Sequence, residues 1–250
     1  PIWKDRPPMP GSSAYLYSTR YAGESRSDKF ARLRSEMKKK GADWYLLTTL
    51  DDIAWLLNLR GNDVHTNPVN VSYLLVGQDH SHLFMDPVKL DTEIESALKD
   101  DQIRIDNYDD IETTLNRIDP DTAILIDPDS VSVRLRQAVS ASCRVIEAPG
   151  PVIAMKAIKN AVQIDHLKQT ALKDGAAMVN FLYWLAHEQG GPHLTELSAA
   201  KKLFEFRQAQ DEFIDNSFDP IMAHGEHAAI CHYNATEASS VPIGGDGIFL

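Results

Sequence analysis

Chemically useful side chains gather in one stretch of the sequence, Phe213–Tyr233. Small and apolar residues here lie among ionisable side chains, of which His224, Glu226, His227 and His232 fall in its second half. Pro220 and Gly225 interrupt the stretch, which is typical of two short strands joined by a turn. Burying an imidazole without a partner is costly, so we expect His232 to face a polar cleft or a firm hydrogen-bond partner.

Simpler interpretations compete with a functional site in this stretch. Taken alone, His232 is typical of a core histidine bonded to a backbone carbonyl. His224, Glu226 and His227 carry the donor atoms of a metal site, but a turn does not place them on one face as a helical His-Glu-x-x-His would. We therefore expect a solvated polar turn at these three residues.

Other polar residues fit structural roles. A nucleophilic role for Ser217 is disfavoured because the Gly-x-Ser-x-Gly elbow is missing. His80 and His82 flank a predicted hairpin turn, and we expect both at the surface. Cys143 and Cys231 lie far apart in sequence, and apolar neighbours predict free, buried thiols in a reducing cytosol.

Upstream of this stretch, apolar periodicity predicts alternating helices and strands. Ser25 or Ser27 caps a helix that Gly41 ends, and Asp51 caps a short helix that ends before Gly61. The other predicted helices cover residues 91–99, 109–118 and 130–139, and the predicted strands are 44–48, one ending at 76, 82–86, 102–106, 123–127 and 143–147. This alternation favours an α/β sheet covered by helices.

The clearest boundary is Ala148–Pro151. A long amphipathic helix over 161–189 and a helix that Thr195 caps follow it, and a strand begins at Ile248. Residues 1–20 contain four prolines and predict a linker from an upstream domain. The predicted division is thus a linker at 1–20, an α/β domain at 21–150 and a second, truncated domain at 151–250.

Composition narrows the class of protein. A chain of 250 residues suggests two domains. The formal charge of −11 argues against nucleic acid or an anionic membrane surface as a partner. The sequence contains no apolar run long enough to span a bilayer, and its first residues lack the apolar core of a signal peptide. These features favour a cytoplasmic protein.

Two segments of the central stretch, Ser217–Ile221 and Ala229–Tyr233, resemble the pita-bread catalytic domain of Xaa-Pro aminopeptidases (aminopeptidase P). Four upstream segments resemble the linker, the second domain and the start of the catalytic domain of the three-domain cytosolic type. They are Trp3–Pro8, Tyr21–Ser25, Leu50–Gly61 with Asn67–Val69, and Met155–Asn160. The resemblance implies an α/β, creatinase-like N-terminal-type domain (a mixed sheet covered by helices), followed by the incomplete start of a pita-bread α+β domain.

What this resemblance implies about function is concrete. Such enzymes release an N-terminal residue that precedes proline, using two divalent metals, typically Mn²⁺, held by two Asp, one His and two Glu. The resemblance places all five ligands after residue 250, so we expect no metal ligands here and no activity from this chain alone. His232 matches the histidine that hydrogen-bonds the substrate and its tetrahedral state. Arg60 lies in the segment that approaches the active-site mouth, which suggests a substrate-binding role.

The resemblance also implies a homodimer and a peptide substrate with proline in its second position. Gly225-Glu226-His227 departs from the Gly-Pro-Asn or Gly-Pro-Thr turn of the family. Two alternatives stay open: a non-catalytic pita-bread binding module, and a creatinase-type amidinohydrolase.

Overall fold

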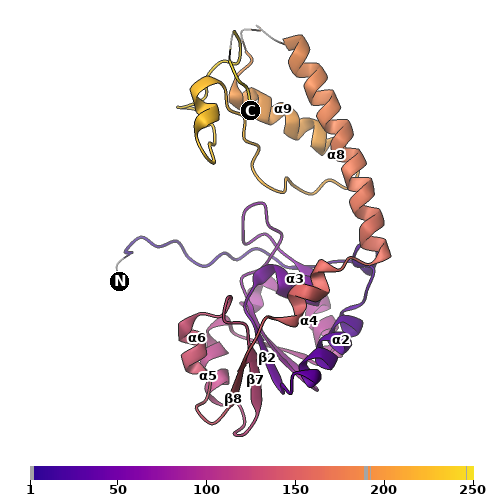
Figure 1. Cartoon of the computed structure of the whole chain (residues 1–250), viewed down its shortest axis with the longest axis vertical. Coiled ribbons are helices and arrows are strands. Elements are labelled where there is room, and N and C mark those ends of the chain that lie inside the picture. Colours follow the sequence, from indigo (N-terminus) through magenta and orange to yellow (C-terminus); the bar gives the residue numbers. More distant parts are fainter. Residues whose placement is uncertain (1–2, 189–190, 192, 246) are drawn as a thin grey trace. The chain divides into compact units, whose positions relative to one another are not determined.

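A computed structural model describes residues 3–188, 191, 193–245 and 247–250 of the chain. The chain divides into two compact units, one that extends to Gln163 and one that begins at Ile164 (Figure 1). Among the described residues, no helix combines the length and apolar character needed to cross a bilayer.

The first unit is built on a six-stranded sheet with the strand order β6-β5-β4-β2-β7-β8. Strand β2 lies near its middle, antiparallel to β4 and parallel to β7. The sheet is therefore mixed, which confirms the predicted fold class. Its strands are β2 (Trp44–Leu47), β4 (Tyr73–Gly77), β5 (Ser81–Phe84), β6 (Ile103–Asp106), β7 (Ala123–Ile126) and β8 (Arg144–Glu147).

Alternate residues of the central strands enter two separate cores. In β4, Leu75 packs in one core, whereas Leu74 and Val76 pack in the other. This alternation follows from the two-residue period of a strand. Figure 1 shows the helices that close the two cores on opposite sides of the sheet. On one side are α2 (Arg26–Lys39), α3 (Leu50–Leu57) and α4 (Thr92–Asp100), and on the other are α5 (Ile111–Asn116) and α6 (Val133–Ala138).

Polar residues define where these helices begin. Ser25 caps α2, as predicted, because its side chain accepts a hydrogen bond from the Asp28 N–H. The prediction that Asp51 caps α3 is wrong. Thr49 is the N-cap residue and Asp51 lies in the first turn, where the helix dipole favours a carboxylate and where it pairs with Lys156. Short 3₁₀ helices, η1 (Pro87–Lys89) and η2 (Tyr108–Asp110), complete the connections.

The last part of the predicted N-terminal linker belongs to the first unit. Strand β1 (Tyr15–Leu16) pairs with β3 (Leu59–Arg60), and the Ala14 N–H donates to the Lys89 carbonyl at 2.8 Å. Helix α1 (Thr19–Ala22) follows. A two-strand pairing with a segment more than forty residues away is a long-range contact that local composition does not reveal.

The first compact unit continues past the predicted boundary at Ala148–Pro151. Helix α7 (Pro151–Ala157) follows that boundary and buries Val152 and Met155 in one core of the sheet. Hydrophobic burial therefore keeps this helix with the first unit, which ends at Gln163.

The second unit packs a small core around α8 (Ala161–Glu188) and α9 (Glu196–Gln208). Within this unit Arg207 of α9 pairs with Asp174 of α8 at 2.7 Å. Both helices were predicted, and a capping box between Thr195 and Ser198 starts α9. The buried apolar residues of the second unit's core are Phe181, Leu194, Ala199, Leu203, Met222 and Ile243.

The prediction of two strands within Phe213–Tyr233 is wrong. The described residues of this stretch contain the 3₁₀ helix η3 (Gly225–Ala229) and a single bridge between His224 and Phe249. The apolar pattern of a short run does not distinguish a buried strand from irregular packed backbone, and the positive φ of Gly225 turns the chain away after one bridge.

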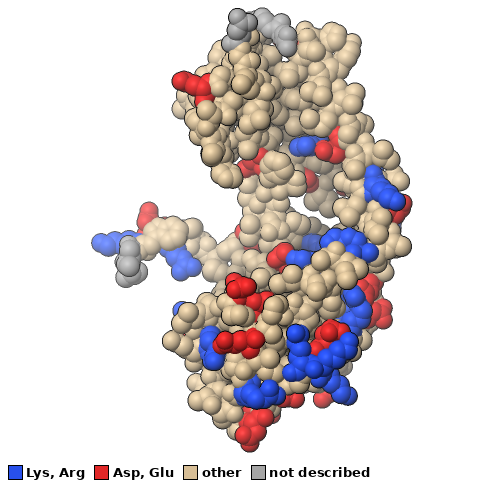
Figure 2. Space-filling view, viewed as in Figure 1, with Lys and Arg blue, Asp and Glu red and all other residues tan. Residues whose placement is uncertain are grey.

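Charged side chains of both signs lie among one another on the first unit (Figure 2). On the face shown in Figure 2, Lys and Arg are interspersed with Asp and Glu over the first unit. The net charge of −11 is therefore not gathered in one field on this face.

A substitution that opens a cavity beside β4 tests whether this sheet carries the core of the first unit. We expect Val76→Ala, at a side chain with no exposure, to lower the free energy of unfolding by about 2 kcal/mol, because two buried methyl groups are lost and a cavity remains. Urea unfolding followed by tryptophan fluorescence measures this.

The matched control is Val88→Ala, at a side chain that is 75% exposed, for which we expect a change within about 0.5 kcal/mol. Equal effects of the two substitutions would contradict this assignment of the core.

Candidate functional site: a buried glutamate beneath the His232 segment

His232 lies in an exposed loop of the second unit. Its side chain is exposed, and its backbone has a φ of 55°, in the left-handed region. The loop follows η3 and leads directly into Tyr233, which is buried. The structure thus presents His232 at the surface, directly before the buried Tyr233, and not in the core.

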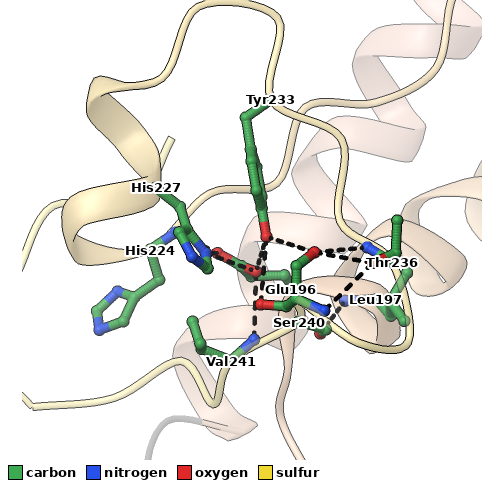
Figure 3. A network of polar contacts seen from close by, with 9 residues as sticks. Glu196, Leu197, His224, His227, Tyr233, Thr236, Ser240 and Val241 are labelled. Carbon is green, nitrogen blue, oxygen red and sulfur yellow. Dashed lines mark hydrogen bonds and ion pairs between the residues drawn. The ribbon is translucent and has the colours of Figure 1, made fainter.

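A buried carboxylate lies beneath this segment. Glu196, the first residue of α9, has no exposed surface and accepts hydrogen bonds from four groups (Figure 3). The donors are the backbone N–H of His224 at 2.8 Å, the Nδ1 of His227 at 3.0 Å, the hydroxyl of Tyr233 at 2.8 Å and the backbone N–H of Val241 at 3.2 Å.

The position of Glu196 has a local cause. Thr195 caps α9 through the Ser198 N–H, so Glu196 occupies the first turn, where the helix dipole favours a negative charge. Burial alone raises the pKa of this carboxyl group. The hydrogen bonds from the His224 N–H, Tyr233, His227 and the Val241 N–H outweigh burial and hold the pKa of Glu196 below its ordinary value.

Two aromatic rings close over the carboxylate. The rings of His227 and Tyr233 stack with centroids 4.5 Å apart and planes inclined by 26°. The Tyr233 oxygen also lies 3.3 Å from the Ser239 hydroxyl. Burial raises the pKa of the Tyr233 hydroxyl, and the neighbouring Glu196 adds to the increase, so this hydroxyl stays a neutral donor.

His224 connects the network to the last residues of the chain. Its ring Nε2 lies 3.1 Å from the Gly244 carbonyl, and its backbone bridges Phe249. Next to this bridge, Ala223 and Leu250 exchange two backbone hydrogen bonds of 3.0 and 2.9 Å. The predicted strand at Ile248–Leu250 is therefore a short antiparallel contact.

The expectation of a solvated turn is only partly right. Glu226 is exposed, as expected, but His227 is half-buried and bound to Glu196. Sequence reasoning missed Glu196 because its position is typical of an ordinary first-turn acid. The capping pattern Thr195-Glu196-Leu197-Ser198 marks the start of a helix. It does not indicate that the Glu196 carboxylate is buried and binds a distant segment.

Arg60 lies in the first unit, in β3, the short strand that follows α3. It donates to the Ala54 carbonyl at 2.6 Å, and its guanidinium carbon lies 4.3 Å from the centre of the Tyr17 ring. Burial lowers the pKa of Arg60, and the Tyr17 and Tyr15 hydroxyls oppose this. The geometry gives Arg60 a helix-capping role, and its substrate role stays a prediction.

Two more positively charged side chains bind carbonyls at the C-terminal end of α3. Lys29 donates to the Trp55 carbonyl at 2.7 Å, and Arg26 donates to the Leu57 carbonyl at 3.2 Å. The last carbonyls of α3 lack partners within the helix, and a positive charge there complements the dipole. Burial lowers the pKa of Lys29 to about 8.

The remaining sequence candidates are dispersed. Cys143 and Cys231 are both free, as predicted, but neither is fully buried. Cys143 is half-buried, and Cys231 is exposed because an irregular loop replaces the expected strand. His80 is exposed, as expected, whereas the expectation of a surface position is wrong for His82, which is half-buried and 2.7 Å from Asp106. Ser217 is exposed.

Comparison with known families assigns the chain. Residues 5–163 match the family model described as the Creatinase/Prolidase N-terminal domain. The chain belongs to the creatinase/prolidase family. Residues 165–250 match the model of Metallopeptidase family M24, so the two family regions follow one another along the chain.

Relatives of this creatinase/prolidase chain carry related names. A probable Xaa-Pro aminopeptidase P of Neurospora crassa is 32% identical over all of this chain, and Xaa-Pro aminopeptidase 1 of Dictyostelium discoideum is 36% identical over 95% of it. The X-prolyl aminopeptidase of Caenorhabditis elegans superimposes with a TM-score of 0.87 at 30% identity, over 96% of this chain. These matches confirm the resemblance to Xaa-Pro aminopeptidases.

This member of the family spans only part of those relatives. It covers 38% of each of the two named sequences and 41% of the nematode chain, which is described as a cytosolic enzyme with a di-nuclear active site.

The part of the chain that the structure describes contains no group of three or more His, Cys, Asp or Glu side chains arranged to hold a metal ion. The described residues therefore do not fit a dinuclear centre by themselves.

The depressed pKa of Glu196 predicts acid sensitivity of the second unit. A carboxyl group whose pKa is lower in the folded protein than in the unfolded chain stabilises the fold at neutral pH, and this contribution is lost as pH falls below about 5 through the folded pKa. We expect hydrogen exchange in residues 194–208, corrected for its intrinsic pH dependence, to show lost protection between pH 6 and pH 3.5.

Glu196→Gln should lower protection at pH 6 and flatten this pH dependence. Glu205→Gln removes a carboxylate of the same helix whose ion pair with Lys202 is exposed to solvent and contributes little to stability, so this control should stay close to the wild-type profile. An unchanged slope in Glu196→Gln would contradict the assignment.

Proposed function

We propose that this chain is part of an aminopeptidase that removes the N-terminal residue preceding proline from peptides. The observation that carries the proposal is the succession of a creatinase/prolidase region and an M24 region, matched across the chain by Xaa-Pro aminopeptidases. The TM-score of 0.87 with an X-prolyl aminopeptidase supports it, because both units contribute to that match.

In this proposal His232 hydrogen-bonds the substrate. Hydrolysis of the bond before proline places negative charge on the carbonyl oxygen of the first residue, and a fixed imidazole N–H stabilises that oxyanion. The exposed ring of His232 can reach a bound peptide, while the packed Tyr233 beside it fixes the backbone. Arg60 is the second proposed substrate contact.

The proposal includes two divalent metals, with Mn²⁺ as their identity. Their ligands would come from residues outside this chain, and the chain alone would then be inactive. The M24 match and the di-nuclear site of the nematode relative support two metals. We also propose a homodimer in the cytoplasm.

Peptide cleavage tests the proposal in a polypeptide that extends this chain through the rest of its M24 region. We expect release of free arginine from Arg-Pro-Pro with added Mn²⁺, and loss of activity on chelation. Mass spectrometry of the products identifies the bond that is cut. Peptide binding without cleavage would favour the binding module, and hydrolysis of creatine alone would favour the amidinohydrolase.

His232→Ala should lower kcat for Arg-Pro-Pro about 10²- to 10³-fold with a small change in KM, because the lost donor acts mainly in the transition state. His193→Ala, at an exposed ring in the same unit, is the control and should keep the activity. Steady-state kinetics at pH 7.5 measures both, and equal kcat values would contradict the role of His232.

A further inference from the structure

The four donors to the Glu196 carboxylate all come from the segment 224–241, two before His232 and two after it. We propose that Glu196 is the positioning residue of His232: it holds the loop that carries this imidazole in the conformation used for catalysis. This inference rests on the proposed function. Glu196 itself touches no reacting atom and acts through the loop.

The anchoring begins before His232. The His224 N–H donates to Glu196 Oε1 at 2.8 Å, and the His227 ring donates to the same oxygen at 3.0 Å. These contacts hold both ends of the first turn of η3. The chain therefore leaves η3 toward His232 from a fixed position.

The anchoring resumes directly after His232. Tyr233, the next residue, places its hydroxyl 2.8 Å from Glu196 Oε2, and the Val241 N–H donates to the same oxygen at 3.2 Å. Stacking of Tyr233 on His227 joins the two anchored ends to each other. Only the five residues Ala228–His232 lie between these two rings.

His232 needs such an external restraint. Its φ of 55° is unfavourable for a residue with a Cβ, and such a conformation persists only where the surroundings impose it. The local backbone supplies two turn bonds, from Ile230 to His227 at 3.0 Å and from Tyr233 to Ile230 at 3.3 Å. Side-chain anchoring by Glu196 supplies the remaining restraint.

A carboxylate is required at this position for a geometric reason. Each of its oxygens receives one backbone N–H, from His224 at Oε1 and from Val241 at Oε2. A glutamine has one acceptor oxygen and one NH₂ donor, so its NH₂ group would face one of these N–H groups. A hydroxyl or an imidazole can reverse its role, but a backbone N–H cannot.

Kinetics of the extended polypeptide test the functional consequence. We expect Glu196→Gln to lower kcat/KM for Arg-Pro-Pro roughly 10- to 100-fold, mainly through kcat, because a displaced catalytic group loses alignment in the transition state. Tyr233→Phe, which keeps the carboxylate and removes one anchor, should show a smaller loss and serves if Glu196→Gln does not fold. Glu205→Gln should keep the wild-type kcat/KM.

A double-mutant cycle separates positioning from a general structural effect. If Glu196 acts through His232, then Glu196→Gln added to His232→Ala should cause no further loss of kcat/KM. Additive losses would overturn the proposal. If His232→Ala alone leaves kcat unchanged, the proposed role of His232 has failed, and the positioning proposal fails with it.

The position of the loop can be measured without activity. Cys231 is exposed and adjacent to His232, so a nitroxide attached there in a Cys143→Ser background reports on the motion of the loop. We expect a restricted spectrum in the otherwise unchanged chain, a mobile component in Glu196→Gln and no change in Glu205→Gln. A label that is equally restricted in Glu196→Gln would overturn the proposal even if activity falls.

Discussion

The architecture of the second unit depends on one buried carboxylate and the donors around it. Glu196 has no exposed surface, and an unpaired charge in such a place would be strongly destabilising. Its four hydrogen bonds come from a segment that has little regular structure of its own. Because Glu196, at the start of α9, accepts these hydrogen bonds, the irregular segment 224–241 takes one defined conformation.

The first unit follows a different physical logic. Its six-stranded sheet buries apolar side chains on both faces, and helices cover each face. Polar and charged groups act there mainly at helix ends, as Lys29, Arg26 and Arg60 do for α3. Burial thus fixes this unit, whereas a polar network fixes the loop surface of the second.

Membership in the creatinase/prolidase family gives these features a common context. The chain covers about two fifths of the relatives it matches, so the catalytic proposal concerns a larger polypeptide. Within that proposal His232 would contact the substrate. The neighbouring Tyr233 fixes the backbone of His232, and Glu196 holds Tyr233 through a hydrogen bond. A loop can then carry a catalytic ring with the precision of a helix or strand.

Local sequence was enough to predict the alternation of helices and strands, the mixed sheet covered by helices, the family, and His232 as a candidate substrate contact. Those features follow from apolar periodicity, capping residues such as Ser25, and motifs that are contiguous in the chain. Three features became visible only in the folded chain: η3 stands where two strands were predicted, Cys231 is exposed, and Glu196 binds residues up to 45 positions away. Long-range hydrogen bonds bring together groups whose local sequences are ordinary, so no local pattern announces them.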